Sequence, residues 1–319
     1  MHRQRTHFAA RVNRVATAIE RRGIVATYEL HDRVLSNRSS RQRFNRSRPA
    51  LDPVQSRVLD ELRAEGFAVL PFSELVSDPE AWRAIEQQAA SFVADTEAGL
   101  AAEREGGDAE GLRRRVGKEF VVRRHSYGVE LGFDDPWFRV CASRRLLDLA
   151  NAYLGLWSKL EYVDVWYSVP QPLEASRVAS QRWHRDFNDR HLLKGFVYLT
   201  DVDEATGPFQ YIAGSAPGGR YADAWPWRPL GANYPPENEL EQRVPPEFRH
   251  VFTGPKGTMI LCNTCGFHRG GFATGKARVL ATMTYSSPAS LASLTERNYR
   301  FRPASPPEPL DAETAYALS

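Results

Sequence analysis

The sequence predicts an α+β protein in which helices come first and many short strands follow, closing into a sandwich or barrel. Two observations support this prediction. Residues 51–155 hold apolar stripes at helical spacing, whereas residues beyond 158 alternate short β-rich runs with clusters of Gly, Pro, Asn and Asp. No regular alternation of strand, helix and strand is visible, which disfavours a parallel sheet.

Three helices are expected in the first half. Their starts share an Asp at the N-cap position and a Pro at the first helical position: Asp52-Pro53, Asp78-Pro79 and Asp135-Pro136. We expect the first helix to stop at Gly66 and the third to run through Leu149 toward Gly155, because glycine readily adopts the backbone conformation that ends a helix. Residues 67–72 are expected to form a strand after the first helix.

The second half is expected to contain five strands, over residues 160–169, 195–199, 208–212, 258–262 and 279–285. A long irregular segment at about 216–250 precedes the fourth of them and carries Trp225, Trp227 and Tyr234. Long loops in compact domains are usually lids or binding loops, although such a segment also serves as structural cover for a sheet. The sequence leaves both interpretations open.

Size and charge divide the chain near residue 50. At 319 residues, 36.0 kDa and 42% hydrophobic residues, the chain has enough apolar side chains for a buried core. Residues 1–50 contain twelve Arg, no Lys and three acids, whereas the rest contains 30 basic and 36 acidic side chains. We therefore predict a basic N-terminal extension over 1–50, flexible and solvated, and a domain over 51–319. Contact with nucleic acid or an anionic surface is the disfavoured alternative, since the Arg residues lack interleaved aromatics for base stacking.

The expected cellular setting follows from apolar runs and cysteines. No stretch approaches the ~18 uninterrupted apolar residues of a membrane span, and the Arg-rich start has no apolar region typical of a secretory signal. The three cysteines, Cys141, Cys262 and Cys265, are too few and odd in number for a disulfide framework. We expect a cytoplasmic protein without a membrane span, and the sequence predicts no particular oligomeric state.

Two segments bring together residue types that bind a metal ion. His184 and Asp186 stand two positions apart, so at the end of a strand both point to one side. His268 follows an apolar strand in a Gly-rich turn, and Arg278 comes ten residues later on the next β-like run. Two His and one carboxylate on one face of a ferrous ion leave positions open for a bidentate 2-oxo acid and dioxygen. Arg278 then offers a planar fork to the distal carboxylate of that acid, and Thr282, on the same face of its strand, offers a hydroxyl.

Other interpretations of these residues are weaker. His-Arg-Asp also opens the catalytic loop of protein kinases, but the required Asn five residues after Asp186 is His191 here, and no Gly-rich loop accompanies it. Cys262 and Cys265 have the spacing of half a zinc or redox site without its partners, so small core residues are the better interpretation. A surface ion pair between His184 and Asp186 is the remaining alternative.

The motifs in this order resemble the phytanoyl-CoA dioxygenase-like family of iron(II)- and 2-oxoglutarate-dependent oxygenases. The resemblance covers roughly residues 54–290 and rests on His184-Arg-Asp186, the strand and turn over 196–209, Tyr211-Ile-Ala-Gly-Ser215, and the segment 257–268 followed by Arg278. It implies a double-stranded β-helix, a jelly-roll or cupin-like barrel, with the N-terminal helices packed on one sheet. The family often has His after the Gly-Ser pair, where this chain has Ala216.

The resemblance also implies an activity and its cofactors. Fe(II) is held by His184, Asp186 and His268, and the cosubstrate 2-oxoglutarate is anchored by Arg278. With O2, such an enzyme hydroxylates an unactivated C–H of a small molecule and releases succinate and CO2; the substrate is a secondary metabolite, an amino-acid derivative or an acyl thioester. Halogenating relatives carry Gly or Ala where Asp186 stands, so the carboxylate favours hydroxylation.

Five charged, polar or ring-bearing residues are the expected substrate contacts: Arg123, His125, Asn188, His191 and Trp225. Two alternatives to the oxygenase stay open. A cupin-like metal isomerase or hydrolase would use the same ligands without 2-oxoglutarate. A non-catalytic binding protein would act through the basic N-terminus.

Overall fold

The structure of the protein is a computed structural model that describes residues 23, 25–105, 120–227, 234–236, 238–291, 297–304 and 309–319. The helices are α2 (Ser36–Arg46), α3 (Pro53–Glu65), α4 (Phe72–Leu75), α5 (Pro79–Arg104), α6 (Pro136–Cys141), α7 (Arg144–Leu154), α8 (Glu239–Arg243) and α10 (Ala312–Leu318). The strands are β1 (Phe67–Pro71), β2 (Val121–Arg123), β3 (Val129–Leu131), β4 (Lys159–Ser168), β5 (Leu192–Tyr198), β6 (Phe209–Ile212), β7 (Arg249–Phe252), β8 (Thr258–Cys262), β9 (His268–Arg269), β10 (Arg278–Ser286) and β11 (Tyr299–Phe301). Residues 25–33 are helical as well. Among the described helices, none is long and apolar enough to cross a membrane.

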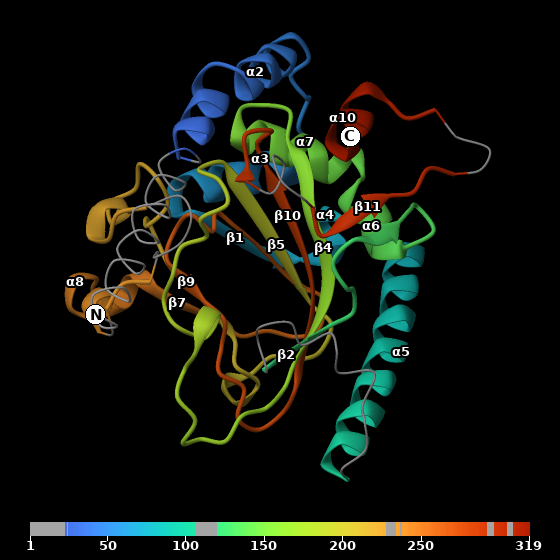
Figure 1. Cartoon of the computed structure of the whole chain (residues 1–319), viewed down its shortest axis with the longest axis vertical. Coiled ribbons are helices and arrows are strands. Elements are labelled where there is room, and N and C mark those ends of the chain that lie inside the picture. Colours follow the sequence, from blue (N-terminus) through green and yellow to red (C-terminus); the bar gives the residue numbers. More distant parts are fainter. Residues whose placement is uncertain are drawn as a thin grey trace, which may run out of the picture.

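The strands form two antiparallel sheets and one short parallel ribbon (Figure 1). The larger sheet has six strands in the order β1-β8-β5-β10-β4-β2, and every neighbouring pair in it is antiparallel. The smaller sheet has the order β7-β6-β9 and is antiparallel too. β3 and β11 pair in parallel. Helices combined with antiparallel sheets confirm the expected α+β class.

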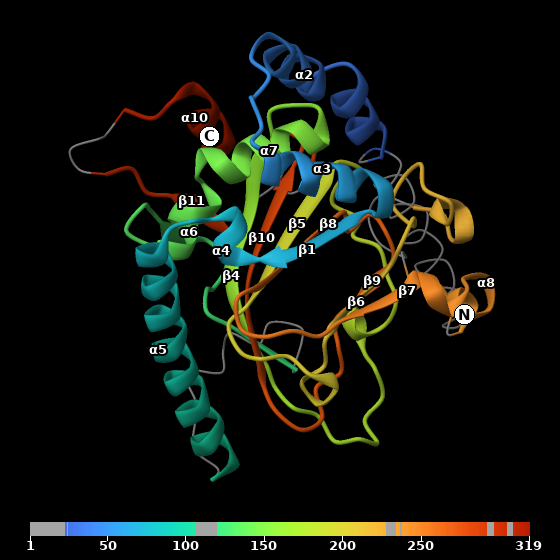
Figure 2. The same cartoon turned by 180° about the vertical axis from the view of Figure 1, so that it is seen from behind.

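Each face of the six-stranded sheet has its own apolar cluster. On one face, side chains of β4, β5 and β10 pack with helices α3, α5, α6 and α7, among them the fully buried Trp137. Figures 1 and 2 show these helices gathered on one side of the sheet. On the other face, Phe196 of β5 packs with Phe209 and Phe252 of the three-stranded sheet. The two sheets therefore face each other across a second core.

The first helix begins and ends as its sequence predicts. In the capping box of α3, Asp52 accepts the backbone N–H of Gln55, and the Gln55 side chain accepts that of Asp52. The helix stops at Gly66, where φ is +86°. A Cβ at this position would lie 2.6 Å from the Tyr211 hydroxyl, so both the backbone and the space require glycine.

The third expected helix is wrong in one respect, because the structure has two helices there. α6 ends at Cys141 and α7 begins at Arg144, with Ala142 and Ser143 between them. Ser143 has an extended backbone, with φ −68° and ψ 147°, which is the conformation of an N-cap, where serine is favoured. The apolar spacing continues across this break, so periodicity alone misses it.

The segment expected to be irregular, at about 216–250, contains α8 and then returns to the sheet. Its last residues, Arg249 and His250, already belong to β7 and pair with Ile212 and Tyr211 of β6. The prediction is wrong at this end because β7 begins with charged and polar residues. Pairing with β6, and not composition, makes these residues a strand.

The described part of the N-terminal block packs against the rest of the molecule. Residues 25–33 and α2 are helical, and Tyr28, Asn37 and Ser40 are fully buried. Residues 25–46 are therefore not a flexible, solvated extension, while residues 1–22 lie outside the described part of the chain. Composition misses this packing, because two of these buried residues are polar and their partners are distant in sequence. The division of the chain near residue 50 stays a prediction.

Candidate metal centre

A β-bridge joins the two predicted metal-binding segments. The backbone N–H of His184 donates to the carbonyl oxygen of His268, and the N–H of His268 donates to that of His184, both at 3.0 Å. The N–H of Asp186 donates to the Thr264 carbonyl oxygen at 2.8 Å. Because β9 also pairs with β6, His268 is fixed from both sides. Backbone pairing thus brings together side chains that the sequence separates widely.

The donor atoms of His184, Asp186 and His268 converge. Asp186 Oδ1 lies 4.0 Å from His184 Nε2 and 3.8 Å from His268 Nε2. Each ring uses its other nitrogen: His184 Nδ1 donates to the Arg182 carbonyl oxygen at 2.9 Å, and His268 Nδ1 to that of Gly266 at 3.1 Å. Because a carbonyl oxygen only accepts, both Nε2 atoms keep a lone pair for a metal ion. Two imidazole nitrogens and one carboxylate oxygen suit a ferrous ion.

A lysine outside the predicted motifs holds the second oxygen of Asp186. Lys194 Nζ, on β5, lies 2.6 Å from Asp186 Oδ2. Burial by itself would raise the pKa of Asp186, but Lys194 and the two imidazoles lower that pKa well below its usual range. Asp186 therefore has one oxygen available to a metal and one already engaged. The available signal in the sequence is a single lysine inside an otherwise uncharged strand.

The three candidate metal ligands line a small hollow of about 70 Å³ that also contains Arg278. The lining consists of Trp166, Ser180, His184, Asp186, Lys194, Phe196, Phe209, His268, Gly270, Arg278 and Leu280. Phe209 lies against His268, with 5.8 Å between the ring centres. Apart from the ionisable groups, the walls are mainly aromatic and aliphatic, which keeps water away from the charges.

Arg278 is a buried cation with no ion pair in the part of the chain that the structure describes. Its Nη1 donates to the Gly207 carbonyl oxygen, and its Nη2 lies 3.4 Å from Ser168 Oγ. Its Nε is buried and has no hydrogen-bond partner among the described residues. Burying an unpaired charge is costly, so this guanidinium favours an anionic ligand.

Thr282 shares the inward face of β10 with Arg278 and Leu280, but it does not line the hollow. Thr282 is fully buried, and its Oγ1 has no hydrogen-bond partner within the described ranges. The step from Arg278 over Leu280 to Thr282 follows the two-residue period of a strand. Leu280 therefore stands between the predicted cosubstrate contacts on that face.

The five side chains predicted to contact the substrate do not line this hollow. Each side chain has a neighbour of its own: Tyr127 for Arg123, Asp164 for His125, Glu161 for Asn188, Asp32 for His191, and the cluster around Trp183 and Ile212 for Trp225. Asn188 and His191 nevertheless belong to the loop that follows Asp186. Substrate roles for the five residues stay predictions.

Two aromatic side chains from the segment 216–250 contact the metal-binding residues. The indole N–H of Trp227 donates to the Asp186 carbonyl oxygen at 2.8 Å. The Tyr234 ring stacks on the His184 ring, with 5.3 Å between ring centres and 17° between planes. The sequence marks both as aromatics in a long segment, but only the fold assigns their neighbours.

The thiols near the metal-binding turn are core residues. Cys262 and Cys265 are free and fully buried. Burial raises the pKa of both thiols. Within the described residues, the triad of His184, Asp186 and His268 is the only group of His, Cys, Asp or Glu that could hold a metal ion.

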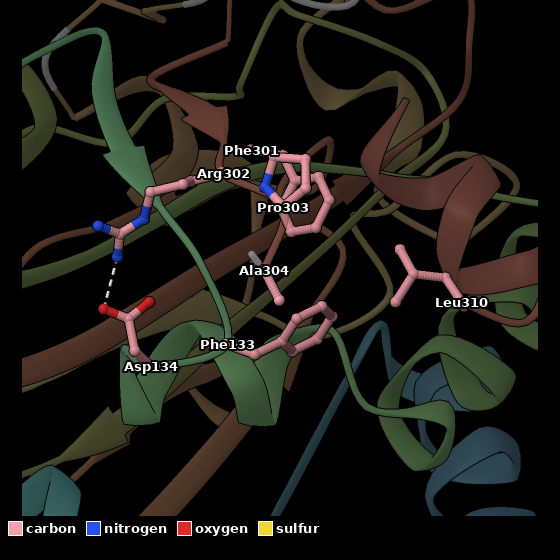
Figure 3. Close-up of a pocket in the computed structure, with 7 residues that line it drawn as sticks. All are labelled: Phe133, Asp134, Phe301, Arg302, Pro303, Ala304 and Leu310. Atoms are coloured by element: carbon pink, nitrogen blue, oxygen red, sulfur yellow. Dashed lines mark hydrogen bonds and ion pairs between the residues drawn. The ribbon is translucent and has the colours of Figure 1, made fainter. Parts of the chain in front are cut away.

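A larger hollow lies elsewhere on the molecule (Figure 3). Its volume is about 450 Å³, and its lining consists of Phe133, Asp134, Phe301, Arg302, Pro303, Ala304 and Leu310. Arg302 and Asp134 form an ion pair with each other, and the other lining side chains are apolar. In the larger hollow no set of donor atoms converges among the described residues, so the smaller hollow is the candidate site.

No protein-family model matches the chain, and no curated protein matches it. Among solved structures, the chain is similar to EctD from S. alaskensis with bound Fe, at 20% identity over 82% of this chain and 92% of that chain, with a TM-score of 0.48. It is also similar to the epimerase SnoN in complex with Fe3+, alpha ketoglutarate and nogalamycin RO, at 18% identity over 74% of this chain and 85% of that chain, with a TM-score of 0.47. AviO1 from Streptomyces viridochromogenes Tue57 matches at 18% identity over 76% of this chain and 98% of that chain, with a TM-score of 0.45. At such low identity, the geometry of the site has to support the functional argument.

Proposed function

We propose that this protein is an iron(II)- and 2-oxoglutarate-dependent dioxygenase of the phytanoyl-CoA dioxygenase-like type, and that its two antiparallel sheets form a double-stranded β-helix. One observation supports the proposal above the others: a His-Asp-His donor set lines the same hollow as the buried Arg278, which has no ion-pair partner among the described residues. The donor set suits a ferrous ion with open positions, and the arginine suits the far carboxylate of a 2-oxo acid. A metal isomerase or hydrolase would explain the donor set but would leave the buried cation without a ligand.

Each ionisable side chain of the hollow has a distinct part in such an enzyme. His184 and His268 hold the metal through Nε2, and Asp186 holds it through Oδ1. When bound, iron and 2-oxoglutarate supply the oxygen-activating chemistry that releases succinate and CO2 and hydroxylates a C–H bond. Lys194 keeps Asp186 Oδ2 engaged, so the carboxylate presents a single oxygen to the metal. Arg278 anchors the far carboxylate of the cosubstrate, with Thr282 as the further contact predicted on the same strand.

The apolar walls serve the same reaction by excluding water. Phe196, Phe209 and Leu280 offer surfaces that suit the methylene groups of a 2-oxo dicarboxylate. A dry site also strengthens the attraction between Arg278 and its ligand. We place the substrate, a secondary metabolite, amino-acid derivative or acyl thioester, beside Tyr234, because this ring of the segment 216–250 covers His184.

Anaerobic spectroscopy tests the proposal. Fe(II) and 2-oxoglutarate together should produce a visible charge-transfer band that neither gives alone. His268→Ala should abolish the band and Asp186→Ala should weaken it, because each removes a donor atom. Asp60→Ala, which changes an exposed carboxylate on α3, should leave it unchanged. Absence of the band in fully metallated wild-type protein would refute the proposal.

Oxygen dependence separates the oxygenase from the cupin-like alternative. Succinate should form from 2-oxoglutarate only when O2 is present, and mass spectrometry of candidate substrates should show the gain of one oxygen atom. A metal-dependent conversion that is insensitive to O2 and forms no succinate would favour the isomerase or hydrolase.

A further inference from the structure

The loop that follows Asp186 is held by the N-terminal segment. Tyr28, on the helical stretch 25–33, is fully buried. Its hydroxyl donates to Asp189 Oδ1 and accepts from the Arg190 backbone N–H, each at 2.8 Å. One side chain therefore satisfies two polar groups of the loop, a few residues beyond the metal-binding carboxylate.

Tyr28 also contacts a second anchor of Asp186. Its ring lies against Trp227, with 5.9 Å between ring centres, and Trp227 in turn donates to the Asp186 carbonyl oxygen. The Arg190 guanidinium lies over both rings, 5.6 Å from that of Tyr28 and 5.1 Å from that of Trp227. Tyr28 thus touches both the loop that carries Asp186 and the indole that fixes its backbone.

A second set of bonds ties the same loop to the N-terminal segment. Asp32 Oδ1 lies 3.1 Å from His191 Nε2 and accepts from Asn37 Nδ2 at 2.8 Å. Asn37 Nδ2 also donates to Ser287 Oγ, just after β10, at 2.9 Å. Asp32 and Asn37 are buried, so these hydrogen bonds offset the hydration that both side chains lose on folding.

Asp189 links Tyr28 to the residue that follows β10. It is fully buried, and its Oδ2 accepts from the Ser287 backbone N–H at 2.7 Å. Without the Tyr28 hydroxyl, Asp189 Oδ1 keeps the His191 backbone N–H at 3.1 Å as its hydrogen-bond donor. A buried carboxylate that loses a donor destabilises its surroundings, and here the surroundings are the loop next to Asp186.

We infer that residues 25–46 are a positioning element of the metal centre, and that Tyr28 holds Asp186 in place through Asp189 and Trp227. This inference rests on the proposed function. It gives the N-terminal block a role that does not depend on its net charge. The groups that hold the loop are the Tyr28 phenol, the Asp32 carboxylate and the Asn37 amide, although arginine is the most frequent residue of the block.

Tyr28→Phe tests the inference, because it removes one oxygen atom and keeps the ring against Trp227. Affinity for Co(II), titrated anaerobically without 2-oxoglutarate, should fall about tenfold, the usual scale for groups that orient a metal ligand. Amide hydrogen exchange of residues 186–191 should become faster, while that of β10 stays unchanged. Tyr127→Phe is the matched control, since Tyr127 is 61% exposed, and it should match the wild type in both measurements.

A double-variant cycle sharpens the test. Trp227→Phe removes the indole N–H that reaches Asp186, so it should weaken Co(II) binding by itself. If both side chains act on the same loop, Tyr28→Phe and Trp227→Phe together should cost less than the sum of their separate losses. Additive losses would contradict a common action on Asp186.

Two other results would overturn the inference. One is an unchanged Co(II) affinity in Tyr28→Phe, even if the melting temperature falls. The other is faster hydrogen exchange spread evenly over the molecule, which would indicate a general structural role. Failure of the proposed function looks different, because the wild type itself would then bind no metal or show no band with 2-oxoglutarate. Hydrogen exchange at 186–191 would still decide whether Tyr28 holds the loop.

Discussion

Both faces of the six-stranded sheet carry an apolar cluster, but only the face toward the three-stranded sheet also carries the buried polar groups of the candidate site. Toward the helices, β10 presents Val279, Ala281 and Met283, all buried in the apolar cluster. Toward the three-stranded sheet, it presents Arg278 and Thr282, whose polar groups are buried near the metal centre. Adjacent residues of one strand therefore have different tasks: those that face the helices stabilise the fold, and those on the other face include the polar groups of the candidate site.

Neighbouring strands repeat the division. Val163 on β4 and Val197 on β5 face the helices, whereas Asp164 and Lys194 lie on the inner face with their β10 partners. Because alternate residues of a strand point to opposite faces, a slip of one residue would push these charges into the apolar cluster. The apolar face thus also determines where the chemical groups lie.

Removal of the Arg278 guanidinium from the inner face should have the largest effect on ligand binding. Arg278→Ala is expected to weaken 2-oxoglutarate binding about a hundredfold, the scale for losing one partner of a buried charge pair, while Fe(II) affinity stays near that of the wild type. Titration of the charge-transfer band measures both. Arg300→Ala, which changes an exposed arginine on β11, is the control. Equal losses of iron and 2-oxoglutarate affinity would show that Arg278 supports the fold and not the cosubstrate.

Truncation on the helix-facing side should cost stability and spare the chemistry. Met283 is fully buried, with its Sδ 3.6 Å from Cys141 Sγ. Met283→Ala leaves a cavity and should lower the free energy of unfolding by about 3 kcal/mol. Urea unfolding measures this loss, while metal and 2-oxoglutarate binding by the folded protein should stay near wild type. Lost cosubstrate affinity at unchanged stability would break the separation of the two faces.

Burial of Asp164 on the inner face should also lower the free energy of unfolding by a smaller amount, which depends on pH. Burial raises the pKa of Asp164 to about 6 from an ordinary value of 3.8, so the folded state binds this proton more tightly than the unfolded state. The contribution to stability is therefore full below about pH 4 and is lost as the pH rises through 6. Relative to wild type, the free energy of unfolding of Asp164→Asn should rise by about 2 kcal/mol between pH 4.5 and 7.

Urea unfolding at the two pH values measures this difference. Asp60→Asn, at an exposed position on α3, is the control and should differ from the wild type by the same amount at both pH values. The same constant difference for Asp164→Asn would mean that burial on the inner face does not change the titration of Asp164.

Local chemistry accounts for the elements that could be predicted from sequence. α3 and α5 begin directly after Asp52 and Asp78, and β8 occupies the residues expected for it. Caps and strand alternation act within a few residues, so they are visible in a single chain. β7 and β11 were not expected, because their pairing with β6 and β3 makes them strands.

The residues of the candidate site also fall into those that the sequence indicates and those that it does not. The triad and Arg278 could be picked out because a two-residue spacing, a Gly-rich turn and a following strand order them along the chain. Lys194, Trp227 and Tyr28 reach Asp186 or its loop from positions that have no regular spacing to it. Sequence patterns therefore indicate the side chains that could bind a metal, but not the side chains that keep those ligands in position.

By itself, the sequence determined which side chains could coordinate a metal, where helices begin, and which strand positions are apolar. Only the tertiary structure decided that Lys194 takes one oxygen of Asp186 and that Tyr28 of the N-terminal block supports the loop beside it. The physical reason is the range of the interactions. Caps and strand alternation depend on neighbours in the chain, whereas a buried hydrogen bond depends on which distant segments fold against each other.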